Sequence, residues 1–293
     1  MLIHIESFIS FIQNEKRYSP NTVLAYKKDL EQFIDFMHSE YEIKDALDIK
    51  HTFIRSWIVQ LMEQSVTARS INRKLSSLKS FYKYLIRKGI VDSSPMAKIT
   101  APKVGKKLPI VVEEKKIALL LESGSPEKND FISLRNKLAL TLLYTTGMRR
   151  SELKNLKETD IDSYQSQIKV LGKGKKERFI PLALEVIESI NNYRSYKQGI
   201  ASEYLLCHED GSQLAPQHLY RIVNTELSKV TTLEKRSPHV LRHTFATHML
   251  NNGADINAVK EMLGHSSLSA TQVYTHNTVE KLKKAYKQAH PRS

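Results

Sequence analysis

Cysteine and long apolar runs are scarce in this sequence of 293 residues, and acidic side chains are fewer than basic ones. Its single cysteine, Cys207, excludes an internal disulfide and favours a reducing compartment, which we expect to be the cytoplasm. No apolar run approaches the roughly 20 residues that a membrane span requires, so no membrane partner is expected. Residues 1–16 carry acidic groups where a signal peptide would have an apolar core, so no signal peptide is expected.

Basic side chains outnumber acidic ones, which leaves the chain strongly positive. Lysine and arginine number 45 against 31 aspartate and glutamate residues, a formal net charge of +14. An excess of this size favours a polyanionic partner, of which nucleic acid is the commonest. A generally basic protein without such a partner is the alternative that charge by itself leaves open.

Hydrophobic periodicity predicts a mainly helical protein with a small antiparallel β-sheet. In the N-terminal part a helix is expected to begin at the capping signal Ser19-Pro20, with further helices over 51–63 and 69–88. Two strands are expected around 166–171 and 176–181. The helices expected in the C-terminal part are 113–122, 130–145, 149–156, 183–198, 216–229, 239–252, 255–263 and 278–289.

A segment rich in proline and lysine divides the chain. Residues 92–109 hold three prolines and four lysines with almost no hydrophobic periodicity, which is typical of a linker. The sequence therefore predicts an N-terminal helical domain over 1–92, a basic linker over 93–109 and a larger domain over 110–293.

The helix expected over 69–88 has an apolar face and a basic face. A basic face is commonly a solvated surface, and contact with a DNA backbone is the alternative. With lysines of the linker and of a glycine-rich hairpin described below, the candidate DNA-binding residues are Arg69, Arg73, Lys74, Lys79, Lys103, Lys106, Lys107, Lys175 and Lys176.

Three strings in the C-terminal part combine arginine, histidine and tyrosine. They are TGMRRSEL over 146–153, PHVLRHTFATHML over 238–250 and LGHSSLSATQVYTH over 263–276. Two arginines, two histidines and a tyrosine suit one task, which is to grip a phosphodiester while the tyrosine hydroxyl attacks it. The candidate catalytic residues in these strings are Arg149, His239, Arg242, His265 and Tyr274.

Arginine suits this chemistry because negative charge develops on the non-bridging oxygens during phosphoryl transfer. Its guanidinium binds phosphate oxygens through two donors and keeps its proton. Arg149 follows a Thr-Gly-Met turn at a helix start, where the backbone also favours an anion, and Arg150 is the competing candidate. Glu152 is expected to support an arginine or the histidine of the second string rather than to react.

The sequence predicts neither a metal nor another cofactor. His239, His243 and His248 share one predicted helix, but the HExxH pattern is absent and no carboxylate lies among them. The string GKGKKERFIP over 172–181 does not match the phosphate-binding pattern GxxxxGK[ST]. It predicts instead a β-hairpin with lysine at its tip.

In content, order and spacing these strings resemble the tyrosine recombinase, or phage integrase, family, and most closely its Xer-type site-specific recombinases. The resemblance covers nearly the whole chain. It implies an N-terminal SAM-like helical core-binding domain and a C-terminal catalytic domain that together form a C-shaped clamp on DNA.

The resemblance also implies a role for each candidate. Tyr274 would be the nucleophile, and His239 would help to accept its proton, because a tyrosine with an ordinary pKa near 10 needs a base or cations at neutral pH. Arg149 and Arg242 would clamp the phosphate, and His265 would donate a hydrogen bond to one of its oxygens.

In the hairpin, Lys173 would protonate the leaving 5′ oxygen, with Lys175 and Lys176 as rivals. Attack would give a 3′-phosphotyrosine and a free 5′ hydroxyl, and exchange of strands would pass through a Holliday junction without ATP or metal. We expect a homotetramer, or a heterotetramer with a second recombinase, on double-stranded DNA with a short two-armed site.

The expected role is resolution of chromosome dimers at a dif-like site during cell division, with a septal DNA translocase as a further partner. One alternative is an integrase or transposase of a mobile element, although no additional arm-binding domain is expected here. A type IB topoisomerase is disfavoured by the short motif spacing. A non-catalytic DNA-binding regulator on the same fold is disfavoured by the complete set of candidate catalytic residues.

The residues after Tyr274 form a last expected element. Apolar side chains recur at intervals of three and four within 278–293, which predicts a short helix with a narrow apolar stripe. The resemblance implies that this helix docks on a neighbouring protomer; packing on its own domain is the alternative.

Overall fold

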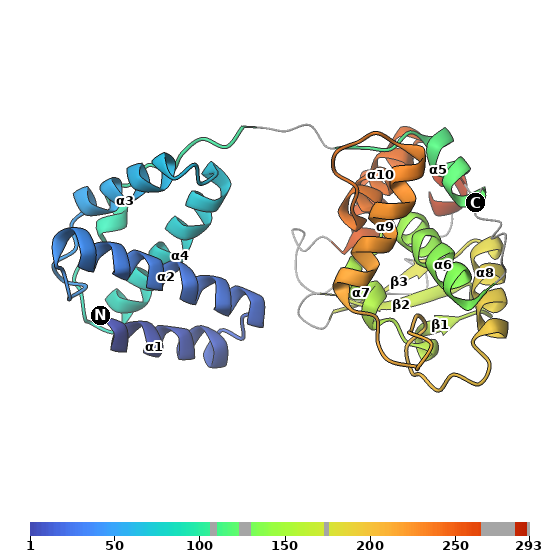
Figure 1. The fold of residues 1–293 in the computed structure, drawn as a ribbon, viewed down its shortest axis with the longest axis horizontal. Helices are drawn as coiled ribbons and strands as arrows, with labels where there is room; N and C mark the ends of the chain where they lie inside the picture. The colour runs from blue at the N-terminus through green and yellow to red at the C-terminus, as the bar shows by residue number, and fades with distance from the viewer. Residues whose placement is uncertain (106–109, 123–129, 173–175, 265–284, 292–293) are drawn as a thin grey trace. The chain divides into compact units, whose positions relative to one another are not determined.

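The computed structural model describes residues 1–105, 110–122, 130–172, 176–264 and 285–291 (Figure 1). The chain divides into two compact units, Met1–Lys107 and Leu108–Ser293, and each is described by itself. The candidates outside the described residues are Lys106, Lys107, Lys173, Lys175, His265 and Tyr274.

The described part of the first unit is built from helices. They are α1 (Leu2–Ser10), the π-helix η1 (Phe11–Glu15), α2 (Pro20–Tyr41), α3 (His51–Glu63), α4 (Ala68–Arg87) and the 3-10 helix η2 (Pro95–Lys98). The predicted start of α2 is confirmed, because the side chain of Ser19 accepts a hydrogen bond from the backbone N–H of Thr22 and Pro20 occupies the first helical position.

Aromatic side chains fill the core of this unit. The Phe33 and Trp57 rings lie 5.0 Å apart between α2 and α3, and Phe8 of α1 meets Phe81 of α4 edge-on at 5.5 Å. The core also takes in Met96 of η2, within the segment predicted as a linker. Residues 95–98 therefore pack with the first unit.

The second unit combines helices with one sheet. Its helices are α5 (Glu114–Glu122), α6 (Phe131–Thr146), α7 (Arg150–Asn155), η3 (Glu158–Asp160), α8 (Leu184–Tyr196), α9 (Pro216–Val230), α10 (Pro238–Asn251) and α11 (Ile256–Leu263). Its strands are β1 (Ile161–Asp162), β2 (Gln167–Leu171) and β3 (Glu177–Pro181), paired antiparallel in that order. The mainly helical fold with a small antiparallel sheet is confirmed.

Helix α6 is the central element of the second unit, because it contacts α5, α7, α8, α9 and α10. Its C-terminal end carries the turn that begins the first candidate motif. Among the described residues, no helix has both the length and the apolar character that crossing a membrane requires.

Residues 285–290 pack on their own unit. Tyr286 and Ala289 are buried in a cluster with Phe245 and Met249 of α10, and the side-chain amide of Asn252 donates to the carbonyl of Ala289 at 3.1 Å. In this structure of a single chain, the end of the predicted tail helix thus packs on its own unit, which was the alternative to docking on a neighbouring protomer. The remainder of that helix lies outside the described residues.

Candidate active site

A glycine turn places Arg149 at the start of α7. Gly147 ends α6 in the left-handed conformation, with φ +60°, and a Cβ at this position would overlap the ring of Phe245. Met148 is then fully buried, so the next residue, Arg149, becomes the N-cap of α7. The Thr-Gly-Met turn that the sequence indicated is therefore formed, and packing against α10 fixes it.

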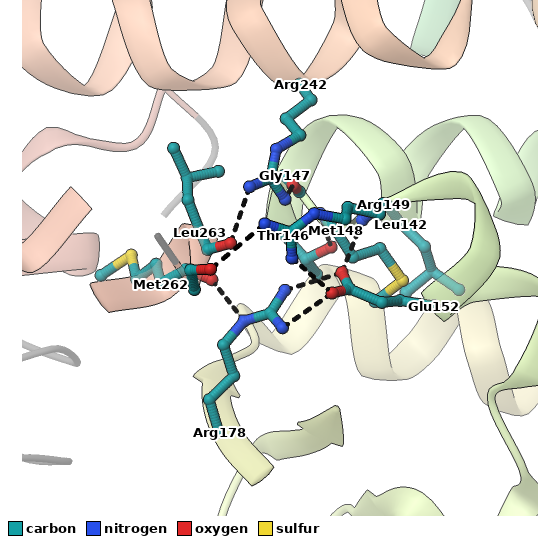
Figure 2. Close-up of polar contacts among 11 residues, drawn as sticks. Leu142, Thr146, Gly147, Met148, Arg149, Glu152, Arg178, Arg242, Met262 and Leu263 are labelled. Carbon is teal, nitrogen blue, oxygen red and sulfur yellow. Dashed lines mark hydrogen bonds and ion pairs between the residues drawn. The ribbon is translucent and has the colours of Figure 1, made fainter. Parts of the chain in front are cut away.

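Glu152 binds two arginines. Its Oε1 accepts from Nη1 of Arg149 at 2.8 Å and from Nη1 of Arg178 at 3.0 Å, and its Oε2 accepts from Nη2 of Arg178 at 2.8 Å. Figure 2 shows both guanidiniums directed at this carboxylate. Burial alone would raise the pKa of Glu152, but the bonds and charge of Arg178, together with bonds from Arg149, lower it to about 2. The carboxylate is therefore ionised at neutral pH.

Arg242 reaches the same place from α10. Its Nη1 donates to the carbonyl of Gly147 at 2.7 Å, and its Nη2 donates to the carbonyl of Leu263 at 2.6 Å (Figure 2). Burial is the main cause that lowers the pKa of Arg242, and the positive charge of Arg149 lowers it further, to about 10. The guanidinium remains protonated at pH 7 but is held in an environment that disfavours its charge, so an anion beside it would be stabilised.

Three guanidiniums converge on the C-terminal end of α11. Arg178 donates to the carbonyl of Met262 at 2.7 Å. Arg242 donates to the carbonyl of Leu263 at 2.6 Å, and Arg149 to that of Gly264 at 3.1 Å. The end of a helix carries partial negative charge, which attracts cations. The side chain of Arg149 keeps 33% of its surface exposed, so it can also meet an anion from solvent.

His239 lies in the first turn of α10 and is exposed. Its pKa lies below the ordinary value, mainly because the ring is partly desolvated and also because Arg150 and Arg242 are positively charged. The imidazole is therefore largely neutral at pH 7 and can accept a proton. Arg150, the rival of Arg149, thus contributes to the electrostatics of this histidine.

The two other histidines of α10 differ from each other in burial. His243 is exposed, whereas His248 is buried and its Nδ1 lies 3.1 Å from the hydroxyl oxygen of Tyr144. Within the described ranges, no group of three or more histidine, cysteine, aspartate or glutamate side chains could hold a metal ion.

Sequence reasoning missed Arg178. It is buried on β3, where it shares the inward face of the strand with Ile180, two positions on. A charged residue at an inward strand position requires a buried partner of opposite charge. The inward position of Arg178 in the strand could therefore have indicated a buried ion pair, and Glu152 is its partner.

The basic face of α4 differs from its prediction at one position. Lys74 is buried, and its Nζ donates to Oδ1 of Asp29 at 3.2 Å and to the side chain of Gln32. Its neighbour Arg73 also pairs with Asp29 but stays about half exposed. Lys74 therefore belongs to the contact between α2 and α4, not to an outward face. The other described DNA-binding candidates are exposed: Arg69, Arg73, Lys79, Lys103 and Lys176.

Comparison with known proteins shows to which family the chain belongs. The sequence pattern of the phage integrase family matches residues 111–281, and that of its N-terminal SAM-like domain matches residues 5–89. The chain belongs to the phage integrase family.

This integrase-family protein is similar over nearly its whole length to proteins named tyrosine recombinases. It is 38% identical to tyrosine recombinase XerC of Bacillus licheniformis, over 98% of this chain and 95% of that protein. It is 37% identical to tyrosine recombinase XerD of Staphylococcus aureus strain Mu50, over 99% of both. The fold matches that of XerH site-specific recombinase bound to palindromic difH substrate, with a TM-score of 0.72 and 24% identity over 90% of this chain and 78% of that one.

Proposed function

We propose that this protein is a site-specific DNA recombinase that cuts and rejoins strands through a 3′-phosphotyrosine. The observation that carries the proposal is the convergence of Arg149 and Arg242 on the end of α11, the helix that leads directly into the string containing His265 and Tyr274. Two fixed guanidiniums beside a mainly neutral histidine match what attack on a phosphodiester needs, namely charge stabilisation and a proton acceptor.

In the proposed reaction, Arg149 and Arg242 bind the non-bridging oxygens of one DNA phosphate, with His265 donating to an oxygen of the same phosphate. The Oη of Tyr274 attacks phosphorus while its proton passes to His239. The bond from phosphorus to the 5′ oxygen breaks, and that oxygen takes a proton from Lys173. The products are a 3′-phosphotyrosine and a free 5′ hydroxyl.

The reaction needs no external energy source because one phosphoester replaces another. The 5′ hydroxyl of a partner strand can attack the phosphotyrosine, which restores Tyr274 and joins the strands through a Holliday junction. Glu152 takes no part in bond making and holds Arg149 through the contacts described above.

The proposal extends to the biological role and the partners. Near-equal similarity to proteins named XerC and XerD supports an Xer-type role, the resolution of chromosome dimers at a dif-like, two-armed site. The assembly would be a tetramer of this chain alone or with a second recombinase, the two units of each chain would clamp the duplex, and a septal DNA translocase would be a further partner. The proposed phosphate contacts are Arg69, Arg73, Lys79, Lys103, Lys106, Lys107, Lys175 and Lys176.

A covalent trapping experiment tests the proposal. The DNA would be a duplex selected by the full chain from a random-sequence pool, with a nick beside the cleavage point so that the released fragment diffuses away. We expect a protein–DNA adduct that survives denaturation and disappears on protease treatment. Tight binding without any adduct would overturn the recombinase proposal in favour of a non-catalytic DNA-binding regulator.

A further inference from the structure

Arg178 joins three separate parts of the candidate active site. From β3 its Nη1 and Nη2 bind the two oxygens of Glu152 on α7, and its Nε donates to the carbonyl of Met262 on α11 at 2.7 Å. The side chain is only 3% exposed, so it has almost no surface with which to contact DNA. Any influence that it has on the reaction passes through the groups that it holds.

Arg178 also packs against two glycines that directly precede candidate catalytic residues. A methyl group built on Gly264 would lie 3.2 Å from Cδ and Nη1 of Arg178, and one built on Gly172 would lie 3.5 Å from Nη1. In the sequence, Gly264 is followed by His265 and Gly172 by Lys173. The buried Arg178 side chain thus lies near the residue that precedes each of these two candidates.

The third connection runs through Glu152 to Arg149. Glu152 uses the same two oxygens to bind Arg178 and to hold both the backbone N–H and the guanidinium of Arg149. If Arg178 were absent, this carboxylate would lose two of the four hydrogen bonds that Arg178 and Arg149 make to it. Its grip on Arg149 would then no longer have a fixed orientation.

We propose that Arg178 is a positioning residue for strand cleavage, holding Arg149 through Glu152 and the C-terminal end of α11 through Met262. The inference rests on the proposed recombinase function. An arginine suits this role better than a lysine, because its planar fork binds both carboxylate oxygens and leaves Nε for the carbonyl, whereas a lysine ammonium has no such fork.

The test separates cleavage from binding. Arg178→Gln and Arg178→Lys would be compared with the unaltered full chain on the selected nicked duplex, with the single-turnover rate measured at saturating protein and Kd measured separately. We expect Arg178→Gln to slow cleavage by about 10²-fold, the effect of a displacement of about 1 Å at a reacting group, with little change in Kd. Arg178→Lys should recover part of the loss because it keeps the charge.

Arg194→Gln is the matched control. Arg194 belongs to the same unit and forms an ion pair with Glu158 at 2.9 Å, but on α8 and outside the site. This variant should cleave at the unaltered rate. Equal slowing by Arg194→Gln and Arg178→Gln would mean that loss of any such ion pair impairs the unit, and would overturn the positioning role.

Thermal unfolding of each variant establishes that the rate is measured on folded protein. If Arg178→Gln does not fold, Glu152→Gln, which keeps the shape of the side chain, takes its place, and the same slowing is expected. A normal single-turnover rate at saturating protein for whichever of the two is folded would overturn the positioning role. Failure of the unaltered chain to form any adduct would instead overturn the proposed function.

Discussion

Glu152 holds Arg149 at two points at once. Its Oε2 accepts the backbone N–H of Arg149 at 2.6 Å, and its Oε1 accepts from the Nη1 of the same residue at 2.8 Å. The first bond fixes where α7 begins, and the second fixes the direction of the guanidinium. The orientation of Arg149 is therefore set by the fold before any DNA arrives, which is the kind of preorganisation that lowers the cost of stabilising a transition state.

The low pKa of Glu152 predicts a stability that depends on pH. Because the folded-state pKa lies below the unfolded value, the stabilisation is complete above about pH 4.5 and is lost as pH falls toward 2. A shift from 4.5 to about 2 corresponds to about 3 kcal/mol of unfolding free energy. Glu152→Gln should lose about this amount at pH 7 and show a weaker dependence on pH between 4.5 and 2.

Urea unfolding of both proteins at several pH values would measure this difference. Glu203→Gln is a suitable control, because Glu203 pairs with Lys157 on the surface, where an ion pair contributes little. A Glu152→Gln variant as stable as the unaltered chain at pH 7 would contradict the buried ion pair.

Tyr274→Phe should abolish covalent attachment to DNA and leave binding nearly unchanged. The substitution removes the nucleophilic oxygen, whereas affinity for DNA comes mainly from contacts between basic side chains and phosphates. Denaturing gels with labelled nicked duplex would detect the adduct, and gel shifts on the same duplex would report binding. An adduct that persists in the variant would assign the nucleophile to another residue.

Lys173→Ala should slow cleavage of ordinary DNA by about 10²–10⁴-fold, the usual contribution of general acid catalysis. A substrate with sulfur at the bridging 5′ position has a leaving group that needs no proton, so it should restore much of the rate. Lys176→Ala, in an exposed lysine of the same hairpin that is a proposed phosphate contact, should bind DNA less tightly but cleave at the unaltered rate at saturating protein. If the sulfur-containing substrate restores the cleavage rate of Lys176→Ala but not that of Lys173→Ala, the general acid is Lys176 and not Lys173.

The sequence predicted the helices well because their signals are local. Capping at Ser19 and the left-handed glycine at Gly147 each act within one turn of the chain, so they could be recognised without a structure. Strand β1 was missed because its two residues, Ile161 and Asp162, are too few to show alternation.

The contacts that organise the site are not local, and for this reason sequence patterns left them out. The pair formed by Arg178 and Glu152 spans 26 residues, and the pair formed by Lys74 and Asp29 spans 45. Helical periodicity assigned Lys74 to the basic face, but it cannot show that a neighbouring helix places a carboxylate at the edge of that face.

Two lysines of α4 should therefore respond differently to substitution. Lys79 is exposed, and Lys79→Ala should weaken binding to a duplex and reduce the slope of log affinity against log salt by about 0.9 if it contacts one phosphate. Lys74→Ala removes a partner from a buried ion pair and should lower the unfolding free energy by about 3 kcal/mol. Salt titrations and urea unfolding of both variants would measure these effects. A reduced salt slope with unchanged stability for Lys74→Ala would contradict its buried position.

The C-terminal end of the chain yields the last prediction. Tyr286 is 3% exposed and stacks on His290 with ring centroids 4.6 Å apart, against Phe245 and Met249 of its own unit. Replacing a buried ring with alanine typically costs about 3–5 kcal/mol. Tyr286→Ala should therefore destabilise even an isolated monomer by about this amount, whereas Tyr164→Ala, at a residue that is 97% exposed, should have little effect.

Unfolding measured across a range of protein concentrations distinguishes packing within one chain from docking on a neighbour. If residues 285–290 pack on their own unit in solution, Tyr286→Ala loses the same unfolding free energy at every protein concentration, because the contact does not depend on association. If Tyr286 were buried only against a second copy, dilution would expose it, and the variant and the unaltered chain would become equally stable. Convergence of the two proteins on dilution would therefore contradict the packing described here and support docking on a neighbouring protomer.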